Sequence, residues 1–166
     1  NGFAQEFVID DATREMIDKW GDVCDDLHTD LHECLGHGSG QLLPGVSADA
    51  LGSYGSTIEE ARADLFGLYY IADPKLTELG LTPSLEAYRS QYYTYMMNGL
   101  LTQLTRIQPG NEIEEAHMRN RALIARWTLE HYPSAVKLVE QDGKTYVEIT
   151  DYLELRNAFA TLLAEI

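Results

Sequence analysis

Cysteine is scarce in this chain of 166 residues, which contains only Cys24 and Cys34. Two cysteines do not make the disulfide framework of a small secreted domain and fit a reducing compartment, so we expect a cytoplasmic protein. Long apolar runs are also lacking: none approaches the ~20 residues that span a bilayer, and the start shows no signal-peptide pattern. Because the chain begins at Asn1 without methionine, an upstream targeting signal stays open.

Basic residues are few as well, with 12 Lys and Arg against 27 Asp and Glu and a formal net charge of -15. A surface of this sign repels phosphate backbones, so we expect no nucleic-acid partner. It also disfavours binding to anionic membranes. The same field attracts the cationic amino terminus of a peptide, which makes a peptide substrate compatible with the composition.

The hydrophobic pattern is helical along most of the chain. We expect helices over 12–20, 57–71 and 84–107, another that Asn111 caps and that ends near His131, and a last one that Asp151 caps. Two short strands over 136–140 and 145–149, joined through Asp142-Gly143, predict a hairpin. The length fits one domain over 1–166. The predicted fold class is mainly α, a multi-helix domain with one small β-hairpin.

The segment His32-Glu33-Cys34-Leu35-Gly36-His37 carries the chemistry, because two imidazoles flank a carboxylate. Neutral imidazole binds zinc, and a neighbouring glutamate can take a proton from a metal-bound water. The histidines are five residues apart, however, and at about 100° per residue a regular helix separates their side chains by about 140°. A π-bulge would absorb the extra residue, and such bulges concentrate at functional sites. We therefore predict an irregular helical turn here.

A third ligand is expected from the acids of the next helix. Glu60 and Asp64 are four residues apart and share a helix face, so one can bind the metal while another acid holds an imidazole from behind. The alternative is purely structural. Ser56-x-x-Glu59 has the pattern of a capping box, and acids in a first helical turn suit the helix dipole without any metal.

These two segments together resemble the paired signature of the dipeptidyl peptidase III family, zinc exopeptidases that release dipeptides from the N-termini of oligopeptides. The matching residues are His32-Glu33-Cys34-Leu35-Gly36-His37 and Glu59-Glu60-Ala61-Arg62-Ala63-Asp64, and Ala116-His117-Met118 resembles the segment around a histidine that assists catalysis in this family. The resemblance covers about residues 31–121. Ala61 stands where some relatives have cysteine, and Asp64 where some have glutamate.

The resemblance implies a zinc centre and a role for each residue around it. One Zn²⁺ ion would be held by His32, His37 and Glu60, with water in the fourth position. Glu33 would take the proton of that water as it attacks the scissile carbonyl. The resemblance adds His117 as a stabiliser of the tetrahedral intermediate, and Glu59 and Asp64 as hydrogen-bond partners of the ligating histidines.

Dipeptidyl peptidase III proteins are longer and two-lobed, with substrate bound between the lobes. The resemblance thus implies that this chain is the core of the helical, zinc-carrying lobe, excised from a longer chain whose second lobe is missing here. We expect it to bind zinc but to hydrolyse dipeptidyl substrates poorly or not at all. Two alternatives stay open: a helical zinc hydrolase of another peptide specificity, and a non-catalytic interaction module with a structural zinc ion.

Four further residues have competing interpretations. On spacing alone His117 suits a core position, and the Ala-His-Met match favours the catalytic role instead. Arg121, one turn later, is either a binder of a substrate carbonyl or carboxylate or a partner for a glutamate. His28 is four residues before His32 and rivals His37 as a ligand, but we expect a solvated helix residue. Cys34 should face away from the metal if both histidines converge.

Overall fold

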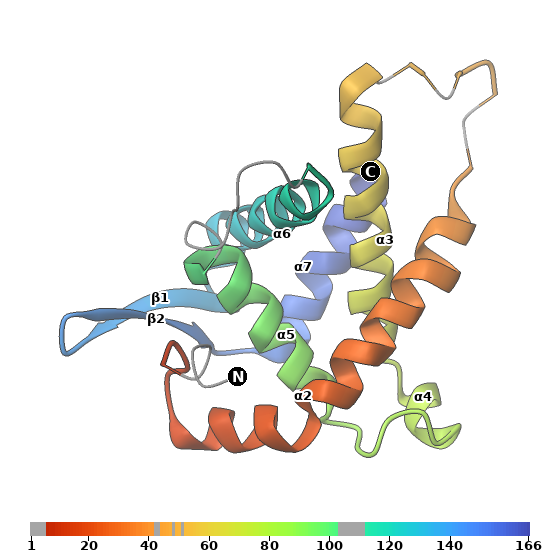
Figure 1. Ribbon diagram of the computed structural model, residues 1–166. Helices are drawn as coiled ribbons and strands as arrows, with labels where there is room; N and C mark the ends of the chain where they lie inside the picture. The colour runs from red at the N-terminus through yellow and green to blue at the C-terminus, as the bar shows by residue number, and fades with distance from the viewer. Residues whose placement is uncertain (1–5, 42–43, 48, 51, 103–111) are drawn as a thin grey trace.

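The computed structural model describes residues 6–41, 44–47, 49–50, 52–102 and 112–166, and it is mostly helical (Figure 1). Its helices are α2 (Asp11–Leu31), α3 (Gly55–Ile71), α4 (Pro74–Glu78), α5 (Tyr88–Met97), α6 (Glu112–His131) and α7 (Tyr152–Glu165). Two strands, β1 (Val136–Gln141) and β2 (Lys144–Ile149), form an antiparallel pair. The predicted fold class, mainly α with a small hairpin, is confirmed.

Helix α2 begins where the sequence indicates and ends much later. The Asp10 carboxylate caps it by accepting a hydrogen bond from the Thr13 N–H at 2.8 Å. The helix then continues past residue 20 to Leu31, because Cys24, His28 and Leu31 fall on one face and are buried. The acidic residues 22, 25, 26 and 30 occupy the exposed positions between them.

Helix α3 begins earlier than expected, at Gly55, and the residue before it makes no side-chain capping hydrogen bond. Ser56 therefore lies inside the helix, and the capping-box interpretation of Ser56 and Glu59 is wrong. Glu59 is left to make contacts outside the helix backbone.

The long helix predicted over 84–107 is shorter at its start. Residues 85–87 form a turn, α5 begins at Tyr88, and it passes into a π-helical segment, η4 (Asn98–Thr102). Residues 103–107 and the predicted cap Asn111 lie outside the described residues. A Cβ on Gly99 would lie 2.8 Å from the Arg121 carbonyl oxygen, so this glycine lets α6 pack directly on the η4 backbone.

The core forms where α5 meets its neighbours, and aromatic side chains fill it. Tyr92 lies edge-on against Phe159 of α7 with ring centroids 5.1 Å apart, and its hydroxyl donates to the Leu68 carbonyl of α3 at 2.6 Å. Tyr93 donates to the Val147 carbonyl at 2.6 Å and so attaches α5 to β2. Tyr92 and Tyr93 of α5 are thus part of the packed core.

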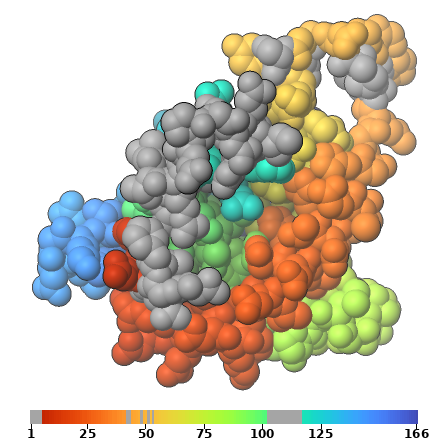
Figure 2. All heavy atoms as spheres, viewed as in Figure 1, coloured from red at the N-terminus to blue at the C-terminus, as the bar shows by residue number. Residues whose placement is uncertain are grey.

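The hairpin projects from one side of the helical body (Figure 2). Asp142 and Gly143 both have positive φ, 52° and 77°, which matches a two-residue turn whose twist suits the flanking strands. The predicted hairpin is confirmed, with each strand one residue longer at the turn. Across the described part of the chain, no helix combines the length and the apolar character that crossing a bilayer requires.

Candidate metal centre

The turn that carries the histidines is irregular, as predicted. Residues His32–Gly36 form one π-helical turn, η1, at the end of α2, and the His37 N–H bonds back to the His32 carbonyl. The extra residue in this turn turns both imidazoles to the same side, with ring centroids 4.8 Å apart. Packing also requires glycine at position 36, because a Cβ there would lie 2.6 Å from the Ala63 Cα of α3. The π-turn and α3 can approach only with glycine at this position.

Arg62 of α3 holds the end of this turn in place. Its guanidinium donates to the Gly36 carbonyl at 3.0 Å and to the Ser39 hydroxyl. It also donates to both carboxylate oxygens of Glu59, at 2.6 and 2.7 Å. The hydrogen bonds from Arg62 to Glu59 lower the pKa of the Glu59 carboxyl below its usual value, and the hydrogen bond from His37 lowers it further.

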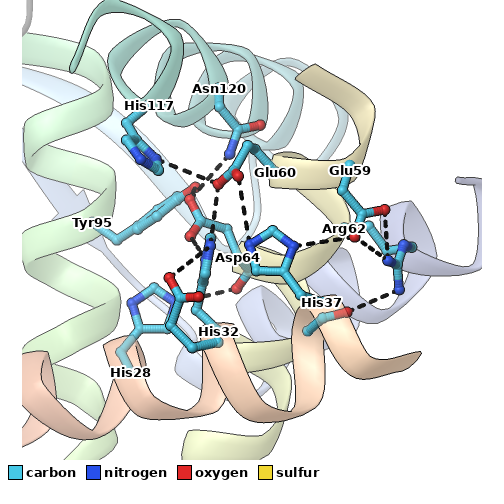
Figure 3. Close-up of polar contacts among 12 residues, drawn as sticks. His28, His32, His37, Glu59, Glu60, Arg62, Asp64, Tyr95, His117 and Asn120 are labelled. Atoms are coloured by element: carbon cyan, nitrogen blue, oxygen red, sulfur yellow. Dashed lines mark hydrogen bonds and ion pairs between the residues drawn. The ribbon is translucent and has the colours of Figure 1, made fainter. Parts of the chain in front are cut away.

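Two acids of α3 hold the imidazoles from behind (Figure 3). The Asp64 carboxylate lies 2.6 Å from His32 Nδ1, and Glu59 lies 3.1 Å from His37 Nδ1. Since an ionised carboxylate only accepts, each Nδ1 carries the proton, and each Nε2 then presents a lone pair in the neutral ring. Both acids were predicted for this place, and their reach is sufficient even with the shorter aspartate.

Both Nε2 atoms face the Glu60 carboxylate. His32 Nε2 lies 3.1 Å from Glu60 Oε2, and His37 Nε2 lies 3.5 Å from Glu60 Oε1. Glu60 Oε2 is buried and accepts no hydrogen bond. Nitrogen lone pairs directed at a carboxylate repel it unless a cation or a shared proton lies between them. The donor set and the unpartnered buried oxygen therefore fit a divalent cation.

The field at this position favours positive charge. The hydrogen bond to Asp64 raises the pKa of His32 against the opposing effect of burial, and the charges of Glu60 and Glu33 raise it further. Burial alone would raise the pKa of Asp64, but the hydrogen bond from His32 and nearby positive charge reverse that effect, and the net shift is downward. Asp64 is thus an ionised partner for the imidazole.

Glu33 lies at the open rim of the same cluster. Its carboxylate is 3.9 Å from His32 Nε2, and 65% of its side chain is exposed. One ligand atom each from His32, Glu33 and His37 lies within 4.8 Å of the other two, so this group could hold a metal ion. Glu60 is nearer to both imidazoles than Glu33 is to His32, and it is 25% exposed. The centre therefore offers two carboxylates, one enclosed and one facing solvent.

His117 of α6 also lies close to the Glu60 carboxylate. Its Nδ1 lies 3.5 Å from Glu60 Oε2, and its ring centroid lies 6.3 Å from that of His32. With 43% of its side chain exposed, His117 is not a core histidine. The structure thus brings together His32, Glu33, His37, Glu60 and His117, with Glu59 and Asp64 behind the imidazoles.

Two polar residues at Asp64 were not found by sequence reasoning. The Tyr95 hydroxyl and the Asn120 amide both donate to Asp64 Oδ2, at 3.0 and 3.1 Å. Both residues are buried, so the Asp64 carboxylate is enclosed by donors from three elements. For Asn120 a signal exists in the sequence, since it follows His117 by one helical turn. Tyr95 has no such signal among the many tyrosines of α5.

Arg121 lies beside Tyr95, the residue whose hydroxyl donates to Asp64. Its guanidinium stands over the Tyr95 ring, 5.9 Å from the centroid. It lines a cavity of about 330 Å³ whose walls include Asp18, Asp22 and Asp25 of α2 and none of the clustered imidazoles. The structure thus shows Arg121 packed on Tyr95, and its contact with substrate stays a prediction.

The expectation that His28 is a solvated residue is wrong. His28 is 5% exposed, and both of its ring nitrogens have protein partners. It is buried because α3 crosses α2 at this point, where Gly67 leaves room for the ring. Cys34 is exposed and stands outside the group that could hold a metal, as expected.

No family model matches the sequence. The resemblance to dipeptidyl peptidase III thus rests on the short motifs, and the geometry described above stands independently of it.

Proposed function

We propose that this chain carries the zinc centre of a metallopeptidase of the dipeptidyl peptidase III type, which releases dipeptides from the N-terminus of oligopeptides. The observation that supports it most is the convergence of two imidazole Nε2 atoms on the Glu60 carboxylate, whose Oε2 is buried, with a second glutamate at the solvent side. Such a set, two neutral nitrogens and one carboxylate, is that of catalytic zinc sites.

We assign His32, His37 and Glu60 as the residues that would hold the ion. Glu60 is preferred to Glu33 because it lies 3.1 and 3.5 Å from the two imidazoles, against 3.9 Å between Glu33 and His32. Glu60 is also mostly enclosed, whereas the Glu33 side chain is 65% exposed. When bound, zinc would supply a water of lowered pKa and polarise a carbonyl oxygen.

The other residues of the cluster would then move protons and fix orientations. Glu33, exposed at the rim, can accept a proton from water and return it to the leaving amine. His117 can donate a hydrogen bond to negative charge developing on the substrate oxygen. Glu59 and Asp64 keep both imidazoles in the Nδ1–H form, so that each Nε2 stays free for the metal.

The substrate class follows from charge and from the motif resemblance. A chain with a net charge of -15 attracts the protonated amino terminus of a peptide. The resemblance alone supports three parts of this proposal: the release of dipeptides, one Zn²⁺ per chain and the need for a second lobe. Free thiols at Cys24 and Cys34 agree with the reducing, cytoplasmic compartment that we propose.

Glu33→Gln, made in the full-length protein that carries both lobes, is the variant that tests the assignment. A catalyst loses turnover and keeps its zinc, because the base is gone while the three ligands remain. A non-catalytic module with structural zinc would keep its properties in this variant. On the same full-length protein, comparing dipeptidyl, single-residue and internally cleavable fluorogenic peptides then separates a dipeptidyl peptidase from an aminopeptidase or endopeptidase. Zinc loss from Glu33→Gln would instead make Glu33 a ligand and overturn the assigned roles.

A further inference from the structure

His28 is a buried histidine that the proposed chemistry does not use. It lies one helical turn before His32 on α2 and is 5% exposed. Its ring lies edge-on to Tyr95, with centroids 5.9 Å apart. A Cβ on Gly67 of α3 would come within 2.4 Å of the His28 Cδ2 and 3.2 Å of the His28 carbonyl oxygen. A glycine at this helix crossing is therefore needed to admit the ring.

The two hydrogen bonds of His28 define one tautomer. Its Nε2 lies 3.1 Å from the Asp64 carbonyl oxygen, which only accepts, so Nε2 carries the proton. The Gln91 amide nitrogen lies 2.9 Å from His28 Nδ1 and donates to it. The same amide lies 3.4 Å from the Asp25 carboxylate, which fixes the amide orientation. Gln91 is 4% exposed, so the pair is enclosed in protein.

Asp64 is therefore held at two places by neighbouring turns of one helix. His28 donates to its main-chain carbonyl, and His32 donates to its carboxylate at 2.6 Å. Holding the backbone limits how far the carboxylate can move from His32 Nδ1. That carboxylate sets the tautomer of His32. Loss of the His28 hydrogen bond would therefore displace Asp64 and change the orientation of the metal-binding Nε2 of His32.

We propose that His28, kept in its Nε2–H form by Gln91, is a positioning residue for the metal centre. It fixes Asp64 through the main chain, and Asp64 fixes His32 with its lone pair toward Glu60. The inference rests on the proposed metal-binding function of this site and adds residues that hold it in a binding-ready geometry. His28 itself is not a ligand, because both of its ring nitrogens are engaged away from Glu60.

The test compares two substitutions at His28 in the 166-residue chain. His28→Leu removes the donor to Asp64, whereas His28→Gln places an amide N–H near the former Nε2. The readouts are zinc affinity of the folded chain, by competition with a chelator, and the visible spectrum of the Co²⁺-loaded chain. We expect His28→Leu to weaken zinc binding about 10-fold, at the low end for residues behind a ligand, and to alter the Co²⁺ spectrum. His28→Gln should restore both, and His131→Leu, at an exposed histidine of α6, is the control.

A merely structural role predicts a different result: His28→Leu would unfold more easily, yet its folded form would bind zinc as the unchanged chain does. That outcome would overturn the proposal. If His28→Leu does not fold, Gln91→Leu decides in its place, since it keeps His28 but removes the donor to Nδ1. It should weaken zinc binding severalfold, and an unchanged affinity would again contradict the positioning role.

Nitrogen NMR of the unaltered, metal-free chain provides a readout that needs no metal. The proposal requires His28 to carry its proton on Nε2 and to have an unprotonated Nδ1. A His28 ring protonated at Nδ1 would overturn the proposal even if zinc binds well. Failure of the unaltered chain to bind zinc, with the His28 tautomer as expected, would instead overturn the proposed function.

Discussion

His32 Nδ1 and Asp64 Oδ1 lie 2.6 Å apart, and both side chains are 8% exposed. The pair joins the π-turn to α3 and directs the opposite ring nitrogen, Nε2, to Glu60. Tyr95 and Asn120 hold the other oxygen of the same carboxylate. The orientation of one imidazole is thus determined by residues from three helices.

Replacing Asp64 by asparagine should weaken metal binding. The amide can still fill the space, but it no longer offers an anionic acceptor to His32 Nδ1, and its own N–H₂ would face a donor. We expect zinc affinity to fall by about 10- to 100-fold, measured by chelator competition. Asp30→Asn, at an exposed position of α2, is the control and should bind zinc unchanged. Equal affinities in the two variants would show that Asp64 does not orient a ligand.

A methyl group at Gly36 should separate the π-turn from α3. An alanine Cβ there would meet the Ala63 Cα at 2.6 Å, and backbone atoms cannot move aside cheaply. We expect Gly36→Ala to lower the free energy of unfolding by about 1–3 kcal/mol, as overpacking does, and to weaken zinc binding. Gly38→Ala is the matched control, because no atom lies within 4 Å of its added Cβ. Urea unfolding of both variants gives the comparison, and similar losses would contradict the packing argument.

The acid side of the stability profile should depend on His28. Burial lowers the pKa of His28 below its ordinary value of 6.5, so the unfolded chain takes up a proton there that the folded chain does not. Above pH 6.5 the protonation of His28 takes nothing from the free energy of unfolding. As the pH falls from there toward the folded pKa, the free energy of unfolding decreases by at most roughly 1.4 kcal/mol per pH unit. In metal-free urea unfolding between about pH 7.5 and pH 5, His28→Gln should flatten the decline.

The control for this pH effect is His131→Gln, which changes an exposed histidine and should keep the slope of the unaltered chain. The shift of His32 acts in the opposite sense but is common to all three proteins, so it cancels in the comparison. An unchanged slope in His28→Gln would mean that His28 does not stay neutral on folding.

Zinc should stabilise the folded chain, because the ligand geometry exists only when η1 and α3 are packed. With free zinc at 100 times its dissociation constant, the gain in the free energy of unfolding is about 2.7 kcal/mol. Thermal unfolding with zinc and with excess chelator measures this gain. Glu60→Gln should lose most of it, whereas Glu33→Gln should keep it. A zinc-induced shift that survives in Glu60→Gln would remove Glu60 from the ligand set.

The sequence was sufficient for the local features of the site. The five-residue interval between His32 and His37 predicts a distorted turn, because a regular helix would separate the imidazoles, and η1 is that turn. The spacing of Glu60 and Asp64 predicts a shared face on α3, and both side chains lie toward the imidazoles. The Asp142-Gly143 turn predicts the hairpin. Each of these depends on residues close together in the chain.

Features that depend on helix crossings could not be read in this way. The burial of His28 requires the distant residues Gly67 and Gln91 to meet α2, and periodicity does not say which helices cross where. Arg121 follows His117 by one turn, yet its guanidinium stands over the Tyr95 ring, a contact that periodicity along α6 does not predict. The capping-box pattern at Ser56 failed because α3 starts one residue before it.

The central claim is that His32, His37 and Glu60 hold one divalent ion. Its most direct test is zinc content per chain after equilibration with limiting free zinc, for the unaltered protein and for His37→Ala and Glu60→Ala. The account predicts one zinc per unaltered chain, most of it lost in each variant while the helical circular dichroism is kept. An unaltered chain that binds no zinc, or variants that bind it as well as the unaltered chain, would contradict the account.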